Sequence, residues 1–114
     1  MVHFEVLGRD ATALRRFYGE AFGWPLGPVA EGPMEYSMVH FGEGAGGIDG
    51  GIGSAGEGAG HATFYVGVDD PQAALDQIER LGGRTVLAPV RIPEGITFAL
   101  FADPEGHVVG LVTE

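Results

Sequence analysis

The chain has 114 residues, enough for one domain with one core, and 45% of them are hydrophobic, which is typical of a globular protein. It contains 16 acidic residues against six arginines and no lysine, so a net charge of −10 argues against nucleic acid or a membrane surface as a partner and favours a cationic ligand. No apolar run reaches the roughly 20 residues that span a bilayer. Cysteine is absent and the N-terminus does not resemble a signal peptide, so we expect a cytoplasmic protein.

The first half of the chain predicts a strand, a helix and three further strands, in that order. The first strand is expected over residues 2–7, and Asp10 is suited to cap a helix that Gly23 ends. Apolar side chains recur along this helix at a spacing that buries one face, and they are expected to build core: Leu14, Phe17, Tyr18, Ala21 and Phe22. The further strands are expected over residues 26–30, 35–41 and 48–52.

The second half predicts the same order of elements. A strand is expected over residues 62–68, and the pair Asp70-Pro71 supplies a helix cap followed by proline at the first helical position. The apolar face of this helix consists of Ala74, Leu75, Ile78 and Leu81. The glycines at 82 and 83 end the helix, and the strands that follow are expected over residues 84–87, 96–101 and 107–113.

A constant shift of 60 positions relates the two halves. Without a gap, it pairs Phe4 with Phe64, Val6 with Val66, Asp10 with Asp70, Gly23 with Gly83, Phe41 with Phe101 and Gly50 with Gly110. One offset that holds through strand, helix and final strand indicates an internal duplication. We expect a single domain over residues 1–114, with module one over about 1–53, a connection over about 54–60 and module two over about 61–114.

The segment between the halves is rich in glycine, with ten glycines among residues 42–60. Its first six residues, GEGAGG, match the GxGxxG pattern of dinucleotide-binding sites. That pattern requires a helix directly after it, and the glycines that follow here would make a helix costly. We therefore interpret the segment as a glycine-rich strand and a flexible connection between the modules.

Four sequence motifs point to a known superfamily. The segments VHFEV, RRFYGEAFGW, FYVGVDDPQAALDQIERLGG and FADPEGHVVGLVTE together cover both halves. On these motifs the chain resembles the vicinal oxygen chelate superfamily, which includes glyoxalase I, bleomycin-resistance proteins and extradiol dioxygenases. The resemblance implies an α+β fold, in which two tandem βαβββ modules form a curved mixed sheet around a central groove.

The resemblance also implies where a metal ion would be held in metal-dependent members. The ligands there come from the first and last strand of each module, and these positions correspond here to His3, Thr63, Gly110 and Gly50, or Gly51 if the register slips by one. Glycine offers no side-chain donor, and a threonine hydroxyl is a poor ligand for ions that prefer imidazole and carboxylate. We therefore expect neither a metal site nor a cofactor.

Strand alternation identifies the side chains that would line the groove. With Phe4 and Val6 under the helix, His3, Glu5 and Leu7 face the groove in module one, and His61, Thr63, Tyr65 and Gly67 do so in module two. The third strand offers either the set Tyr36, Met38 and His40 or the set Glu35, Ser37 and Val39, and the resemblance favours Tyr36 and Met38. Module two adds either Thr97, Ala99 and Phe101 or Ile96, Phe98 and Leu100. The predicted ligand-binding residues are His3, Glu5, Tyr36, Met38, His61, Thr63, Tyr65 and Phe101.

Three functions remain open at this point. The first is a metal-independent small-molecule-binding protein of the glyoxalase and bleomycin-resistance type. The second is a lyase, isomerase or dioxygenase that uses an off-pattern metal site or a His3–Glu5 acid–base pair, since these residues lie two apart on one strand and point the same way. The third is an interaction domain without a ligand. In each case we expect a homodimer, because an open sheet leaves edges that a partner covers.

Overall fold

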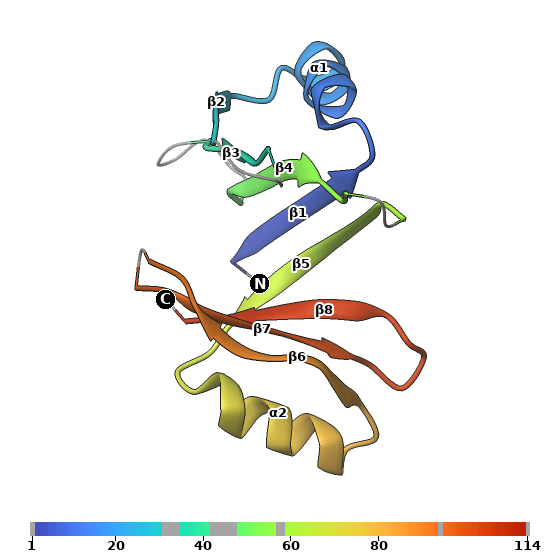
Figure 1. Cartoon of the computed structure of the whole chain (residues 1–114), viewed down its shortest axis with the longest axis vertical. Coiled ribbons are helices and arrows are strands. Elements are labelled where there is room, and N and C mark those ends of the chain that lie inside the picture. Colours follow the sequence, from blue (N-terminus) through green and yellow to red (C-terminus); the bar gives the residue numbers. More distant parts are fainter. Residues whose placement is uncertain (1, 31–34, 42–47, 57–58, 94, 114) are drawn as a thin grey trace. The chain divides into compact units, whose positions relative to one another are not determined.

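The computed structural model describes residues 2–30, 35–41, 48–56, 59–93 and 95–113 of the chain. These residues divide into two compact units, an N-terminal unit over residues 2–62 and a C-terminal unit over residues 63–114. Each unit has the strand and helix order that the repeat predicts (Figure 1). The predicted α+β fold with two tandem βαβββ modules is therefore confirmed.

The N-terminal unit packs one helix on a mixed sheet. Its elements in chain order are β1 (His3–Gly8), α1 (Ala11–Phe22), β2 (Leu26–Val29), β3 (Ser37–Val39) and β4 (Gly50–Ser54). The strands lie in the order β2-β3-β4-β1, and β1 runs parallel to β4 while the other neighbours are antiparallel. The GxGxxG-like segment at residues 42–47 lies outside the described residues.

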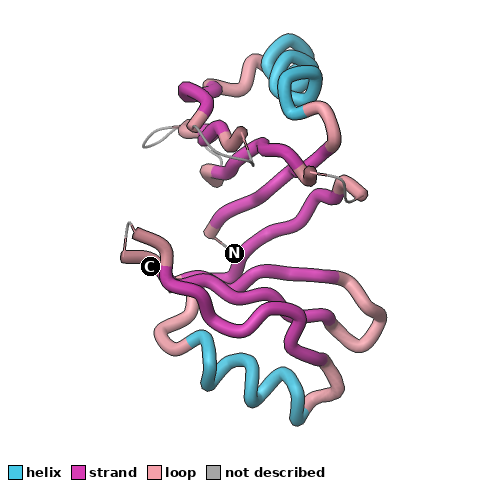
Figure 2. Tube along the Cα trace, in the orientation of Figure 1, coloured by secondary structure: helices cyan, strands magenta, loops and turns pink. Residues whose placement is uncertain are grey.

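The C-terminal unit repeats this topology. β5 (His61–Gly67) enters it and is followed by α2 (Pro71–Arg80), β6 (Arg84–Arg91), β7 (Thr97–Ala102) and β8 (Val108–Val112). The strands lie in the order β5-β8-β7-β6, and β5 runs parallel to β8. Figure 2 shows the helix and the strands of each unit in contrasting colours. The longest helix in the described residues is 12 residues long, and none of these helices has the length and apolarity to cross a membrane.

Both helices begin at the aspartates that the sequence predicts. Asp10 accepts a hydrogen bond from the backbone N–H of Ala13 at 2.9 Å, and Asp70 accepts one from Ala73 at 3.1 Å. These bonds satisfy donors that the first helical turn otherwise leaves unpaired. Gly23 ends α1 with φ +67°, a left-handed conformation that glycine adopts without strain.

The two helices bury their apolar faces to different extents. In the C-terminal unit, Leu75 of α2 is 1% exposed and packs with Ala99 and Leu111 of the sheet. Five partly buried side chains pack against this cluster: Val66, Val68, Ala74, Ile78 and Phe101. In α1, by contrast, Ala11 is the only buried residue. Phe17 and Phe22 are 59% and 66% exposed. The prediction that the whole α1 stripe builds core is therefore wrong.

The aromatic side chains at the end of α1 pack mainly on one another. The rings of Tyr18 and Trp24 are stacked with centroids 4.6 Å apart, and Phe22 lies 6.0 Å from Trp24. Trp24 also contacts Phe4 of β1, with ring centroids 5.1 Å apart. The large rings thus cover one another above the sheet and leave Phe17 and Phe22 largely in water.

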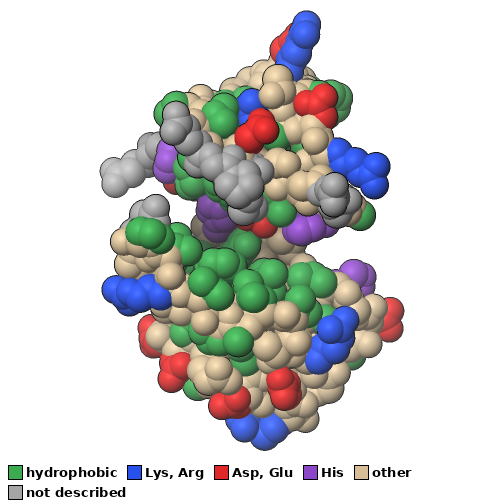
Figure 3. Space-filling model, in the orientation of Figure 1, with side chains coloured by type: hydrophobic (Ala, Val, Ile, Leu, Met, Phe, Trp, Pro, Cys, Tyr) green, Lys and Arg blue, Asp and Glu red, His purple; other side chains and the backbone are tan. Residues whose placement is uncertain are grey.

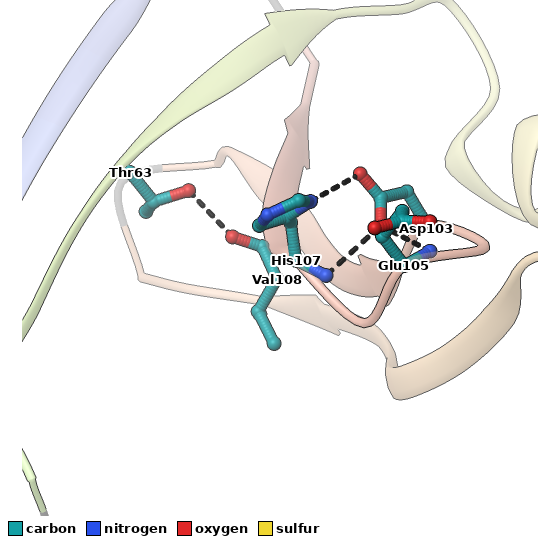
Figure 4. Close-up of polar contacts among 5 residues, drawn as sticks. All are labelled: Thr63, Asp103, Glu105, His107 and Val108. Atoms are coloured by element: carbon teal, nitrogen blue, oxygen red, sulfur yellow. Dashed lines mark hydrogen bonds and ion pairs between the residues drawn. The ribbon is translucent and has the colours of Figure 1, made fainter.

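The turn between β7 and β8 is held by one carboxylate (Figure 4). Asp103 Oδ1 accepts hydrogen bonds from the backbone N–H groups of Glu105 and His107, each at 2.9 Å, and its Oδ2 lies 2.9 Å from Nδ1 of the His107 ring. These bonds lower the pKa of Asp103. His107 therefore stabilises the turn between β7 and β8 through its bonds to Asp103.

Candidate functional site

Four of the predicted site residues meet in the N-terminal unit. His3 and Glu5 lie on the same face of β1, opposite Phe4, which packs against Trp24 beside α1. The hydroxyl of Tyr36 lies 2.9 Å from Nε2 of His3 and donates a hydrogen bond to Oε2 of Glu5 at 3.2 Å. Nε2 of His61 lies 3.9 Å from the other carboxylate oxygen. We call His3, Glu5, Tyr36 and His61 the polar cluster.

The polar cluster is a chain of groups that can exchange hydrogen bonds. Tyr36 has one hydroxyl hydrogen, and when it is donated to Glu5 the bond to His3 is made by Nε2–H of the imidazole. Glu5 is 8% exposed, whereas the side chain of His61 is 46% exposed. The cluster therefore links a nearly buried carboxylate to an imidazole in contact with water.

Burial favours the neutral form of His3. Loss of solvent lowers the pKa of His3 below its ordinary value of 6.5, and nearby His40 lowers this pKa further. Asp49 acts in the opposite direction, and its carboxylate also binds Nδ1 of His40 at 3.2 Å and the backbone N–H of Phe41 at 3.0 Å. Hydrogen bonds from Phe41 and His40 lower the pKa of Asp49, so its carboxylate adds a negative charge near His3.

The lowered pKa of His3 predicts a pH dependence of folding. The unfolded chain binds a proton at His3 near pH 6.5, while the folded chain binds it only at lower pH. The contribution of His3 to the free energy of unfolding is thus fully present above pH 6.5 and declines as the pH falls from there through the folded-state pKa. We expect His3→Asn to reduce the loss of stability in urea unfolding between neutral and acidic pH.

The His3 titration can also be measured directly by NMR of the imidazole C–H protons. We expect its midpoint to lie below 6.5. A midpoint at or above 6.5, or an unchanged pH dependence in His3→Asn, would contradict the burial argument.

Tyrosine rings occupy the space at two of the positions that correspond to metal ligands. In the N-terminal unit Gly51 pairs with Glu5, so the register slips by one relative to the repeat, and a Cβ built on Gly51 would overlap the tip of the Tyr36 ring. In the C-terminal unit Gly110 pairs with Tyr65, and a Cβ there would overlap the ring of Tyr65 itself. At Gly110 a ligating side chain has no room, and at Gly51 it would have to displace the tip of the Tyr36 ring.

The remaining metal-ligand positions do not provide a donor set. The Thr63 hydroxyl donates a hydrogen bond to the carbonyl of Val108 at 2.6 Å (Figure 4), and His3 is engaged with Tyr36. Within the described ranges, no three His, Asp or Glu side chains are grouped so as to hold a metal ion. Among the described residues, the donors at these positions therefore do not fit the divalent ion that the resemblance implies for metal-dependent members.

The other predicted ligand-binding residues lie on different elements. Met38 of β3 pairs with Gly51 and so shares the face of Glu5, as the choice of Tyr36 and Met38 predicts. Thr63 and Tyr65 belong to the C-terminal unit. The predicted groove involves both modules together and stays a prediction.

Phe101 does not lie on the face that was predicted for it as a ligand-binding residue. It packs against the cluster of Leu75, Ala99 and Leu111 and therefore lies on the α2 face of its sheet. Leu100 pairs with Gly110, so the alternative set of Phe98 and Leu100 occupies the face of Tyr65. Figure 3 shows apolar side chains gathered on the part of the C-terminal unit away from α2. Alternation offered both sets, and only the packing of α2 distinguishes them.

Comparison with known proteins shows which family the chain belongs to. A family model described as a glyoxalase-like domain matches residues 3–112. The chain belongs to the glyoxalase-like domain family. This confirms the superfamily resemblance carried by the sequence motifs.

Two relatives illustrate the family by sequence. A glyoxylase-like domain-containing protein of Didymella fabae is 28% identical over 114 residues, covering 96% of this chain and 89% of the relative. CFP32 of Mycobacterium bovis, which carries a glyoxylase name, is 32% identical over 106 residues, covering 90% of this chain. The match spans 41% of the length of CFP32.

Solved structures share the fold at low identity. A methylmalonyl-CoA epimerase from Streptomyces coelicolor, in complex with 2-nitronate-propionyl-CoA, has a TM-score of 0.70 at 16% identity, covering 100% of this chain and 96% of that one. A glyoxalase/bleomycin resistance protein/dioxygenase superfamily member from Vibrio splendidus has a TM-score of 0.67 at 15% identity, covering 100% and 98%. These glyoxalase-like neighbours support the fold, and the site rests on the residues of this chain.

Proposed function

We propose that this glyoxalase-like protein binds a small molecule at the polar cluster without a metal ion. The observation that carries the proposal is the overlap of Tyr36 and Tyr65 with any side chain at Gly51 and Gly110. At each of these two glycines, where the resemblance implies a metal ligand, a tyrosine ring lies over the backbone. An aromatic face with a carboxylate and two imidazoles supplies the apolar surface and the few polar groups that small-molecule sites combine.

The charge of the cluster favours a cationic ligand. Glu5 offers a nearly buried carboxyl group, burial favours neutral His3, and the carboxylate of Asp49 adds a negative charge near His3. The whole chain carries a net charge of −10, which attracts cations over a long range. The CoA ester bound by the epimerase neighbour carries several phosphate charges, and the field of this chain would repel such a ligand. We therefore propose an amine with an apolar or aromatic body.

A matched pair of probes tests the ligand class. Phenethylamine and phenylpropionate share an aromatic body and differ in charge, and their binding can be followed by calorimetry. We expect the amine to bind with one-to-one stoichiometry, more weakly as salt is raised, and the carboxylate not to bind. Glu5→Gln should weaken amine binding, whereas Asp69→Asn, which removes the same charge from an exposed residue, should not.

Two results would count against this function. Preferential binding of the carboxylate, or unchanged amine binding in a folded Glu5→Gln variant, would exclude the cation site. In the second result, the protein binds one Zn²⁺, Mn²⁺ or Ni²⁺ ion per chain with micromolar affinity or better and loses this binding in His3→Ala. That result would exclude a function without a metal ion.

A second candidate function is acid–base catalysis by the same cluster. Tyr36 joins His3 to Glu5, and the exposed His61 lies near the other Glu5 oxygen, so Glu5 could exchange a proton with water through an imidazole. Turnover of a bound probe that Glu5→Gln abolishes while binding persists would favour the enzyme over the binding protein. The cysteine-free composition supports a cytoplasmic location for either function.

A further inference from the structure

The chain approaches β3 through a residue in the left-handed conformation. Glu35 has a φ of +45°, and within the described ranges it is the single residue other than glycine with a positive φ. In this conformation the Cβ comes close to the following carbonyl oxygen, so residues other than glycine, asparagine and aspartate rarely adopt it. Such residues persist where the surrounding structure imposes them, and they are enriched at functional sites. The next residue in the chain is Tyr36 of the polar cluster.

Both peptide groups that flank the Cα of Tyr36 accept a hydrogen bond. Nη1 of Arg15 in α1 donates to the carbonyl of Glu35 at 3.3 Å, and the backbone N–H of Ala30 donates to the carbonyl of Tyr36 at 2.8 Å. Nη2 of Arg15 also donates to the hydroxyl of Thr12 at 3.1 Å, which holds the guanidinium beside its own helix. The backbone on both sides of the tyrosine is therefore fixed, and one of the bonds that fix it comes from a side chain of α1.

The faces taken by Tyr36 and Ser37 are the reverse of what burial alone favours. Ser37 pairs with Ile52, which in turn pairs with Val6, so the serine lies on the α1 face of the sheet and is 0% exposed. Its hydroxyl has no hydrogen-bond partner among the described residues, and burial of an unpaired hydroxyl is unfavourable. A shift of β3 by one residue would exchange the two side chains. The observed register therefore places the aromatic ring in the polar cluster at the expense of stability.

We propose that Arg15 and Glu35 are positioning residues for the ligand site: the left-handed backbone of Glu35, bonded to Arg15, directs the Tyr36 ring into the polar cluster. Arg15 acts on the ligand through the backbone of Glu35 and the ring of Tyr36. The consequence for ligand binding rests on the proposed function, whereas the placement of the ring can be measured without a ligand.

NMR of the chain without a ligand tests the placement of the ring. Because the tip of Tyr36 lies over Gly51, its ring current shifts the Hα protons of that glycine, and Tyr36→Leu gives the shift without the ring. We expect Arg15→Met to move the Gly51 signal toward the ring-free value. Arg16→Met is the matched control, because it removes the same charge from a side chain of α1 that is 81% exposed and bonded to Glu20. An unchanged signal in Arg15→Met, or an equal change in Arg16→Met, would overturn the proposal.

Two substitutions at Glu35 separate the backbone conformation from the side chain. Glu35→Asn and Glu35→Val both remove the charge and shorten the side chain, but asparagine adopts the left-handed conformation more readily than β-branched valine. We expect the ring-current shift of Gly51 to be kept in Glu35→Asn and lost in Glu35→Val. Equal shifts in the two folded variants would show that the left-handed backbone does not direct the ring. If Glu35→Val does not fold, the comparison of Arg15→Met with its control decides.

Calorimetry with phenethylamine tests the consequence for the ligand site. Arg15→Met makes the chain more negative, so charge alone predicts tighter binding of the amine, whereas a displaced Tyr36 ring predicts weaker binding. We expect binding to be about two- to tenfold weaker, which corresponds to one hydrogen bond of ordinary strength, and not to weaken in Arg16→Met. Binding to Arg15→Met as tight as to the wild type would overturn the positioning role. If the wild type does not bind the amine, the proposed function fails, and the Gly51 signal still decides the placement of Tyr36.

Discussion

Leu75→Ala is expected to lower the free energy of unfolding by about 2–5 kcal/mol, the largest stability effect we predict for a single truncation. Leu75 is 1% exposed and lies at the centre of the cluster that joins α2 to β7 and β8. Its removal takes away the transfer free energy of the side chain and leaves a cavity beside Ala99 and Leu111. Chemical unfolding followed by circular dichroism measures the loss.

Leu81→Ala is the control for this truncation. Leu81 has the same chemistry and is 69% exposed at the end of α2, so its replacement is expected to change the free energy of unfolding by no more than about 0.5 kcal/mol. Equal losses in the two variants would show that α2 does not anchor its unit through Leu75.

Gly110→Ala is expected to cost about 1–3 kcal/mol through overlap with the Tyr65 ring. The atoms that a Cβ would meet include Cγ of Tyr65, so the ring cannot avoid the methyl group by moving its tip alone. If the overlap is the cause, Gly110→Ala should cost much less in a chain that already carries Tyr65→Ala. A double-mutant cycle in urea measures this coupling.

Gly51→Ala provides the comparison within the other unit. There the methyl group would meet the tip of Tyr36, near its hydroxyl, which can move aside at the expense of the bonds to His3 and Glu5. We expect a smaller loss of stability than at Gly110 and a weakened polar cluster. For the Gly110 pair, in contrast, the double-mutant cycle decides: additive losses of stability in Gly110→Ala and Tyr65→Ala would contradict the overlap argument.

Much of the fold could be predicted from the sequence because the shift of 60 positions pairs the elements of one half with those of the other. Asp10 and Asp70 both cap helices, and the strand order of one unit repeats in the other. The burial of α1 could not be predicted in this way. Helical spacing identifies an apolar face, but it does not tell whether rings such as Tyr18 and Trp24 pack on the sheet or on one another.

The candidate site was predictable only in part. Alternation placed His3 and Glu5 on one face, but the contact of Tyr36 with both residues spans more than 30 positions and has no local signal. Phe101 was assigned to the wrong face because alternation fixes the parity of a strand without identifying the side that a helix covers. The slip that brings Gly51 opposite Glu5 is likewise a property of strand pairing.

The pairing of tyrosine rings with glycines also bears on how this chain could change over evolutionary time. A mutation that places a carboxylate at Gly110 would create strain instead of an ion site, because the Tyr65 ring already fills the volume. A mutation that removes the ring first would leave a void in place of an aromatic surface. Each single step at this pair is disfavoured, so a side chain at position 110 is expected to be tolerated only together with a change at Tyr65. The glycine and the ring that covers it are therefore expected to be replaced as a pair, not one at a time.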